Sequence, residues 1–329
     1  MRNWINALGL ALLAACFSAP ALSASKAQDN KQASAKHGKK AAQRKSNLSR
    51  VATTNARKQV NVARTMAAPV IAEHPGVQSA GVLILNEKNG EVVYEKNADS
   101  IAPIASITKL MTAMVVLDAR LPMNELLTIG LEDVDTLKNT SSRLGVGTQL
   151  TRAEMLLLAL MSSENRAASA LSRHYPGGQI AFVRRMNEKA RELGLGSTRF
   201  LDPTGLAPHN VSTARELAKL VTAAHRYAEI HHFSTASEYA FVSNVSGREL
   251  QFRNTNPLVR EQDWTIGLSK TGYTSEAGRC LVMQATINGS PVVMVLLDSE
   301  GKFTRIGDAT RVRKWLETSP YAQLHASTY

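Results

Sequence analysis

The pattern of apolar and polar residues predicts β-hairpins near both ends of the folded part of the chain. Each hairpin is indicated by two apolar runs that flank an Asn-Gly dipeptide. The runs are 78–86 with 91–97, around Asn89-Gly90, and 278–287 with 291–298, around Asn288-Gly289. Asn-Gly favours a tight turn because both residues accept a positive φ.

The remaining apolar residues recur mostly at spacings of three and four, which predicts amphipathic helices. The expected helices are 107–119, 151–161, 179–194 and 212–228, with a closing helix at 304–318. Capping-box patterns mark two of the starts, at Thr151 with Glu154 and at Ser212 or Thr213 with Glu216. Along the chain, a hairpin is followed by a block of helices and then by further strands. This order favours one α/β domain whose sheet is built from both chain ends.

The first 24 residues, MRNWINALGLALLAACFSAPALSA, combine a basic start, an apolar run and small residues before residue 25. They predict a secretory signal peptide that is cleaved near Ala24 and is too short to span a membrane. The mature protein is then expected in the periplasm, without a transmembrane span. A second interpretation stays open, because LAAC at 13–16 resembles a lipoprotein box in which Cys16 would carry a lipid.

Residues 25–67 are rich in Lys, Ala, Gln, Ser and Asn, and we expect a disordered linker there. Most of the chain's net charge of +12 lies in this stretch, where eleven Lys or Arg stand against one acid, Asp29. The linker serves either as a spacer or as a basic segment attracted to an anionic envelope surface. Export excludes the nucleic-acid interpretation of its charge.

Ser106 and Lys109 lie near the start of an otherwise apolar helix, in PIASITKLMTAMVVLDA at 103–119. Residues three apart share a helix face, so the hydroxyl and the amine can meet. Apolar surroundings and the positive end of the helix dipole both lower the pKa of a lysine. A neutral amine beside a hydroxyl is a general base beside a nucleophile. By itself, Ser-x-x-Lys is a weak signal that occurs by chance in many helices, where the serine is an N-cap and the lysine is exposed.

Two further motifs favour the catalytic interpretation. Ser163, Glu164 and Asn165 abruptly end the apolar pattern of LLLALMSSENRAASAL, and Lys270-Thr271-Gly272 lies on an extended segment before a strand. Ser-x-x-Lys, Ser-x-Asn and Lys-Thr-Gly, in this order, are typical of penicillin-recognising acyl-transfer enzymes.

With these motifs the chain resembles the low-molecular-mass penicillin-binding proteins that act as D-alanyl-D-alanine peptidases, and among them the periplasmic D-alanyl-D-alanine endopeptidases. The resemblance covers nearly all of residues 76–318, including TRFLDPTGLAPHNVSTARELAKL, FRNTN and KTGYTSEAGRCLVM. It implies a β-lactamase/transpeptidase-like α/β fold, with an antiparallel sheet flanked by helices and a helical subdomain. The peptidase domain would occupy 68–320, followed by a short tail at 321–329.

The resemblance implies a role for each matching residue. Ser106 would be the acylated nucleophile, Lys109 its general base, and Ser163 the relay of a proton to the leaving amine. The substrate-binding residues would be Asn165, Lys270, Thr271, Gly272, Tyr273 and Arg305. Within this set, the backbone N–H groups of Ser106 and Tyr273 would form the oxyanion hole. Arg305 would bind a carboxylate, although a surface arginine without that role is the plainer interpretation.

The implied reaction is hydrolysis of D-Ala–diaminopimelate cross-links in peptidoglycan, with covalent binding of β-lactams and without metal or organic cofactor. Other cell-wall enzymes are expected partners. We expect no C-terminal β domain or anchor of the carboxypeptidase type, because the last strands and helix use the residues after Gly272. A carboxypeptidase that trims pentapeptides, or a non-catalytic wall-binding scaffold, remains an alternative. Residues 166–200 lack the Glu-x-x-x-Asn pattern of class A β-lactamases, so the penicillin adduct should be long-lived.

Overall fold

The computed structural model describes residues 74–318. The expected signal peptide at 1–24, the linker at 25–67, Cys16 and the tail at 321–329 lie outside the described residues, as do both proposed limits of the peptidase domain. The helices are α1 (Thr108–Asp118), α2 (Arg152–Met161), α3 (Asn165–Arg173), α4 (Gly178–Glu192), α5 (Ala214–His225), α6 (Ala228–Thr235) and α7 (Thr304–Thr318).

Strands from both ends of the described chain form one antiparallel sheet, as expected. Its order is β2-β1-β11-β10-β9. These strands are β1 (Gly81–Asn86), β2 (Glu91–Lys96), β9 (Thr265–Thr274), β10 (Gly278–Ile287) and β11 (Ser290–Ser299). The pairing of β1 with β11, in which Val82 faces Leu296, joins the N-terminal hairpin to the C-terminal strands. The sheet therefore closes only when segments some 200 residues apart in sequence meet.

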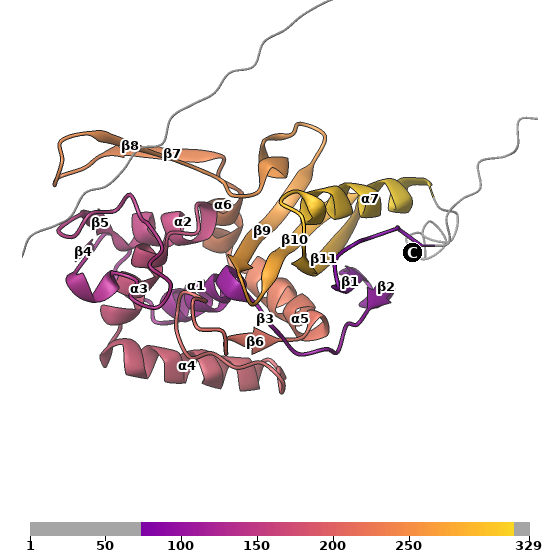
Figure 1. Ribbon diagram of the computed structural model, residues 1–329, viewed down its shortest axis with the longest axis horizontal. Helices are drawn as coiled ribbons and strands as arrows, with labels where there is room; N and C mark the ends of the chain where they lie inside the picture. The colour runs from indigo at the N-terminus through magenta and orange to yellow at the C-terminus, as the bar shows by residue number, and fades with distance from the viewer. Residues whose placement is uncertain (1–73, 319–329) are drawn as a thin grey trace, which may run out of the picture. The chain divides into compact units, whose positions relative to one another are not determined.

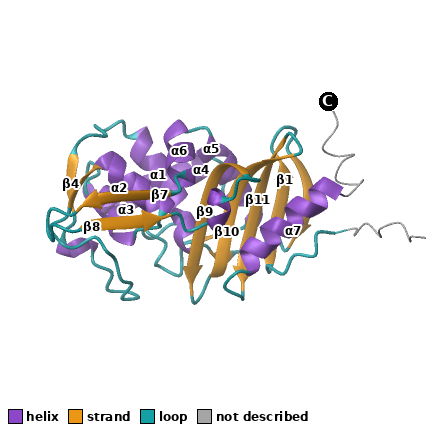
Figure 2. Ribbon diagram, turned by 90° about the horizontal axis from the view of Figure 1, so that it is seen from above, coloured by secondary structure: helices purple, strands orange, loops and turns teal. Residues whose placement is uncertain are grey.

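Alternation of side chains along the strands gives the sheet two buried faces. Leu83 of β1 and Val282 of β10 belong to the core under the helices, whereas Ile84 and Leu281 pack on the side of α7. Figure 2 shows α7 crossing the sheet on one face while the other helices gather beyond it. Both faces are covered, which explains why these strands are apolar at nearly every position.

The helical part contains elements that the hydrophobic pattern did not predict. These are α3, α6 and the hairpin β7 (Glu238–Val242) with β8 (Glu249–Arg253), which extends over α2 (Figure 1). In the strands β7 and β8 exposed residues alternate with half-buried ones, or with the buried Phe252, rather than forming a continuous apolar run. Smaller two-stranded pairs join β3 (Ala102–Pro103) to β6 (Val211–Ser212) and β4 (Leu126–Thr128) to β5 (Gln149–Thr151).

The two predicted Asn-Gly turns differ in geometry. Asn288 and Gly289 both have positive φ, at 49° and 75°, which is the tight two-residue turn that the dipeptide favours. In the first hairpin only Gly90 has a positive φ, and a four-residue loop at 87–90 separates the strands. The N-caps at Thr151 and Thr213 are present, and each accepts a hydrogen bond from the backbone of the expected glutamate.

None of the helices between residues 74 and 318 combines the length and apolarity needed to cross a membrane.

A buried carboxylate on α7 fixes the start of the described chain to the sheet. Asp308 has no exposed side-chain surface, and its oxygens accept bonds from the backbone N–H groups of Gln78, at 3.0 Å, and Ser79, at 2.7 Å. The Ser79 hydroxyl donates a further bond of 2.5 Å to Asp308 and lies 2.8 Å from the Ser299 hydroxyl. Arg311 forms an ion pair with the same carboxylate.

Asp308→Ala should lower the free energy of unfolding by about 2–4 kcal/mol, because it leaves buried donors without an acceptor. The measurement is urea unfolding of both proteins. Asp263→Ala is the matched control, since Asp263 is bound to the same helix through Arg313 but its side chain is 65% exposed. Loss of an exposed ion pair should cost no more than about 1 kcal/mol. Equal losses in the two variants would show that the Asp308 contacts do not stabilise the fold.

Candidate active site

Ser106 lies in a 3-10 turn, Ala105–Ile107, which leads directly into α1. Ala105 has a positive φ of 46°, a strained conformation for a residue with a side chain. Lys109 is the second residue of α1 and is fully buried. The predicted spacing therefore does bring the two side chains together, with Lys109 Nζ 2.8 Å from Ser106 Oγ.

Lys109 Nζ has three oxygen neighbours, and they come from three separate parts of the chain. Besides Ser106 Oγ, these are the side-chain oxygen Oδ1 of Asn165 and the backbone carbonyl of Thr204, each at 2.7 Å. Asn165 Oδ1 and the Thr204 carbonyl can only accept hydrogen bonds, whereas a hydroxyl can donate or accept. The amine is thus held by two fixed acceptors and one reversible partner.

The protonation state of Lys109 decides the direction of its bond to Ser106. Burial lowers the pKa of Lys109 to about 7, while the charges of Asp202 and Glu164 act in the opposite direction. A neutral amine has two N–H donors, which the two fixed acceptors take up, and one lone pair. The lone pair then faces the third neighbour, so Ser106 Oγ–H must donate to Lys109. This arrangement prepares the hydroxyl to lose its proton.

Asn165 is the first residue of α3 and is oriented by its own amide. Its Nδ2 donates to Thr140 Oγ1 at 3.1 Å, so Oδ1 is the atom that faces Lys109. Behind it, Glu164 is buried and its Oε2 accepts a 2.6 Å bond from Ser142. Glu164, the middle residue of the Ser-x-Asn motif, is therefore enclosed by the fold rather than solvated.

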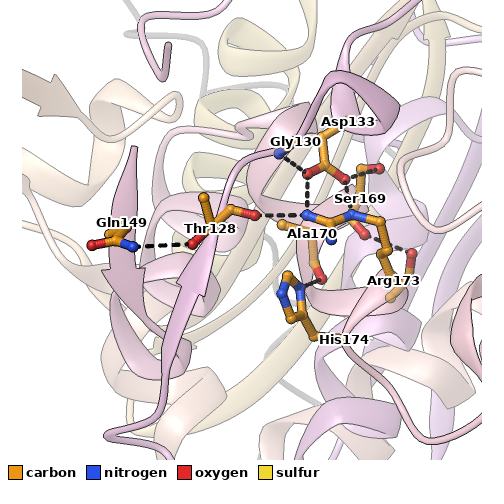
Figure 3. Close-up of polar contacts among 9 residues, drawn as sticks. Thr128, Gly130, Asp133, Gln149, Ser169, Ala170, Arg173 and His174 are labelled. Carbon is orange, nitrogen blue, oxygen red and sulfur yellow. Dashed lines mark hydrogen bonds and ion pairs between the residues drawn. The ribbon is translucent and has the colours of Figure 1, made fainter. Parts of the chain in front are cut away.

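An ion pair with a buried carboxylate fixes α3 to the 3-10 turn Leu131–Asp133 (Figure 3). Asp133 is fully buried and accepts bonds from Arg173 at 2.7 Å and 3.2 Å, and from Ser169 at 2.8 Å. Arg173 also donates to the Thr128 carbonyl at 2.6 Å. Because α3 carries Asn165 at its other end, these contacts hold the acceptor of Lys109 in place.

The loop at 201–207 supplies the third neighbour, and Asp202 organises it. The Asp202 carboxylate accepts four bonds, from Thr204 N and Oγ1, Gly205 N and Ala207 N, at 2.5–2.7 Å. Gly205 has a φ of +86°, and a Cβ there would lie 1.9 Å from the carbonyl oxygen of Ala105. The loop thus lies against the 3-10 turn Ala105–Ile107, which carries Ser106 and is called the nucleophile turn below. DPTG belongs to a stretch that carries the family resemblance, but the sequence pattern does not show that it meets Lys109.

Ser163 and Lys270 form a second hydroxyl–amine pair. Ser163 lies between α2 and α3 with a positive φ of 63°, and Lys270 Nζ lies 2.9 Å from its Oγ. Lys270 is almost fully buried on β9 and also donates to the Thr271 carbonyl at 2.9 Å. Burial, and then the charges of Lys109 and Arg305, lower the pKa of Lys270 well below its ordinary value.

The strand β9 lies directly against the nucleophile turn at Gly272. A Cβ on Gly272 would approach the Ile104 carbonyl oxygen to 3.0 Å and the Ser106 nitrogen to 3.3 Å, so a side chain there would force the two segments apart. Thr271 Oγ1 donates to Thr255 Oγ1 at 2.6 Å. Tyr273 follows with 57% of its surface exposed.

Arg305, in the first turn of α7, is half-buried, so it is more enclosed than a surface arginine. Its Nε and Nη1 are buried without a hydrogen-bond acceptor in the described part of the chain. Its positive charge is close enough to Lys270 to lower the pKa of that lysine. Among residues 74–318 no group of three or more His, Cys, Asp or Glu could hold a metal ion.

Comparisons with known proteins point to one family. The sequence profile of the family described as D-alanyl-D-alanine carboxypeptidase matches residues 68–301. A D-alanyl-D-alanine endopeptidase from Pseudomonas aeruginosa is 50% identical over 249 residues, which is 76% of this chain and 80% of that protein.

Solved structures agree. A DD-transpeptidase from Streptomyces is similar with a TM-score of 0.69 and 29% identity, over 74% of this chain and 98% of that one. A penicillin-binding protein from Listeria monocytogenes, in an ampicillin-bound form, has a TM-score of 0.62 and 27% identity, over 73% and 97% of the two chains.

Lys109 should titrate near pH 7, and Glu164→Gln should lower its pKa further, because the negative charge of Glu164 raises it. The measurement is an NMR titration of protein labelled with carbon-13 at the lysine Cε, with the signal assigned by its loss in Lys109→Met. Glu300→Gln, an exposed carboxylate elsewhere, should leave the titration unchanged. A Lys109 signal that titrates near pH 10, as exposed lysines do, would contradict the effect of burial.

Proposed function

This chain belongs to the D-alanyl-D-alanine carboxypeptidase family of serine peptidases, and from that premise we propose that it is an endopeptidase of peptidoglycan. It hydrolyses the bond between D-Ala and diaminopimelate that cross-links two peptide strands. The observation that carries the proposal is the contact set of Lys109, whose two fixed acceptors leave its lone pair to the hydroxyl of Ser106.

Acylation follows from this geometry. Ser106 Oγ attacks the D-Ala carbonyl carbon while its proton passes to Lys109 Nζ. The negative charge that develops on the carbonyl oxygen is stabilised by the backbone N–H groups of Ser106 and Tyr273, and loss of one such donor typically costs about 10²–10³ in rate. Because Gly272 lets β9 approach the nucleophile turn, these two N–H groups belong to neighbouring segments.

The leaving amine then needs a proton. Ser163 relays it: its hydroxyl donates a proton to the amine and takes up in return the proton that Lys109 received from Ser106, and Lys270, at 2.9 Å from that hydroxyl, supports the transfer. The donor strand stays on Ser106 as an ester and the acceptor strand departs with its amine restored. Water then hydrolyses the ester and returns Ser106 to its starting state. The chemistry uses side chains and backbone alone, and we expect no metal or organic cofactor.

Cations at the edge of β9 suit a substrate with a carboxylate beside the scissile bond. Thr271 and Arg305 bind that carboxylate, and Asn165 binds the peptide of the donor strand. A β-lactam presents an acylating carbonyl and a carboxylate in a similar relation, so penicillin acylates Ser106 and stays bound. An endopeptidase is favoured over a carboxypeptidase because the relative with 50% identity carries the endopeptidase name.

The setting of the enzyme is part of the proposal. The first 24 residues direct export to the periplasm and are removed near Ala24, and lipidation at Cys16 is the alternative. Residues 25–67 link the peptidase domain, 68–320, to the new N-terminus, and 321–329 form a tail. Other cell-wall enzymes are proposed partners in remodelling the wall and setting cell shape.

The test uses the chain from residue 25 onward with two defined muropeptides, a D-Ala–diaminopimelate cross-linked dimer and a pentapeptide monomer. Mass spectrometry should show dimers converted to monomers. Ser106→Ala should keep the thermal unfolding midpoint, leave the dimer intact and take up no penicillin, because it lacks the attacking oxygen. Loss of only the terminal D-Ala from monomers would make the protein a carboxypeptidase, and full activity of Ser106→Ala would remove Ser106 from its role.

A further inference from the structure

Arg279 lies beside the candidate site and has no place in the reaction described so far. It is on β10, directly opposite Tyr273 of β9 in the strand register. Its guanidinium carbon lies 4.3 Å from the centre of the Tyr273 ring, so the cation stacks on the aromatic face. A stack of this kind contributes about 0.5–1 kcal/mol at an exposed site and holds the guanidinium in one orientation.

Arg279 and Arg305 are neighbouring cations. Arg305 is half-buried, with two buried donors that have no acceptor. Burial lowers the pKa of Arg305, and the positive charge of Arg279 lowers it further. Neither guanidinium has a carboxylate partner among residues 74–318, whereas most other enclosed arginines do, such as Arg173 with Asp133.

Without an anion the two guanidinium groups repel each other, and Arg305 also lacks part of its hydrogen bonding. Such a pair is costly to the free protein unless a ligand supplies the negative charge. Arginine is the residue whose planar fork binds a carboxylate through two parallel bonds. The pair therefore suits a ligand that brings more than one carboxylate to this edge of β9.

We propose that Arg279 is a specificity-determining residue that binds a second carboxylate of the departing strand. The inference rests on the proposed function and deepens it. Arg305 and Thr271 bind the carboxylate on the reacting centre, which every substrate of this kind has. Arg279, held on Tyr273, binds a carboxylate that only a departing peptide strand carries.

The two substrate classes differ in this respect. When a pentapeptide is trimmed, the departing group is a single D-Ala with one carboxylate. When a cross-link is cut, the departing group is a diaminopimelate residue within a peptide, which carries the carboxylate of its reacting centre and further carboxylates of its own strand. A second cation thus adds affinity for the cross-linked substrate and contributes nothing comparable to the departure of free D-Ala.

The experiment measures kcat/KM of the wild-type chain and of Arg279→Gln on the cross-linked dimer and on the pentapeptide. Arg279→Gln should lower the ratio of dimer to pentapeptide kcat/KM about tenfold, mainly through KM for the dimer, since loss of one charge-assisted contact has about this effect. Arg279→Lys keeps the charge without the fork and should restore part of the ratio. Arg226→Gln, an exposed arginine at the end of α5, should not change it.

The thermal unfolding midpoint of each variant is measured as well. A midpoint equal to that of the wild type shows that the change in the ratio reflects binding and not folding. A ratio that stays constant in Arg279→Gln, whether both substrates slow equally or neither does, would overturn the inference and leave the endopeptidase proposal standing. Intact dimers in the wild-type reaction would overturn the proposed function, and this inference with it.

Discussion

The candidate site depends on one constraint, which is that a buried amine must find partners for all of its hydrogen-bonding groups. Lys109 has no access to water, and its three neighbours are Ser106 Oγ, Asn165 Oδ1 and the Thr204 carbonyl. Two of these can only accept, so a neutral Lys109 forces the hydroxyl to be the donor. The nucleophile is thereby prepared by the same contacts that make burial of the amine tolerable.

The surrounding fold brings these partners together. The strand β9 lies against the nucleophile turn at Gly272, and the loop around Asp202 lies against the same turn at Gly205. The helix α3 places Asn165 beside Lys109. Each contact joins segments far apart in sequence, and the contacts of the Asp202 loop and of α3 are fixed by buried polar groups as well as by packing. A network in which every member is satisfied gives a single arrangement, which acyl transfer needs because small displacements cost much of the rate.

The sequence predicted the sheet and the residues of the three motifs, because apolar runs that flank an Asn-Gly turn and the spacing of residues within a motif are local properties. It did not predict β7 and β8, which are half-exposed, or the burial of Glu164, which depends on Ser142. It also missed Asp202, whose carboxylate shapes a loop that only the tertiary fold brings to Lys109. The site beyond its motifs is set by long-range contacts, and the roles of its residues remain proposals.

The most direct test of this account is the pH dependence of Ser106 acylation, measured by stopped-flow with a fluorescent penicillin from about pH 5 to about pH 9. The lowered pKa of Lys109, about 7, means that the amine is neutral above that pH and protonated below it. The second-order acylation rate constant should therefore be high in the alkaline range and fall as the pH drops through about 7. A rate that is constant over the whole range, or that is still rising at its alkaline end without a plateau, as the ordinary pKa of a lysine would give, would contradict the claim that neutral Lys109 activates Ser106.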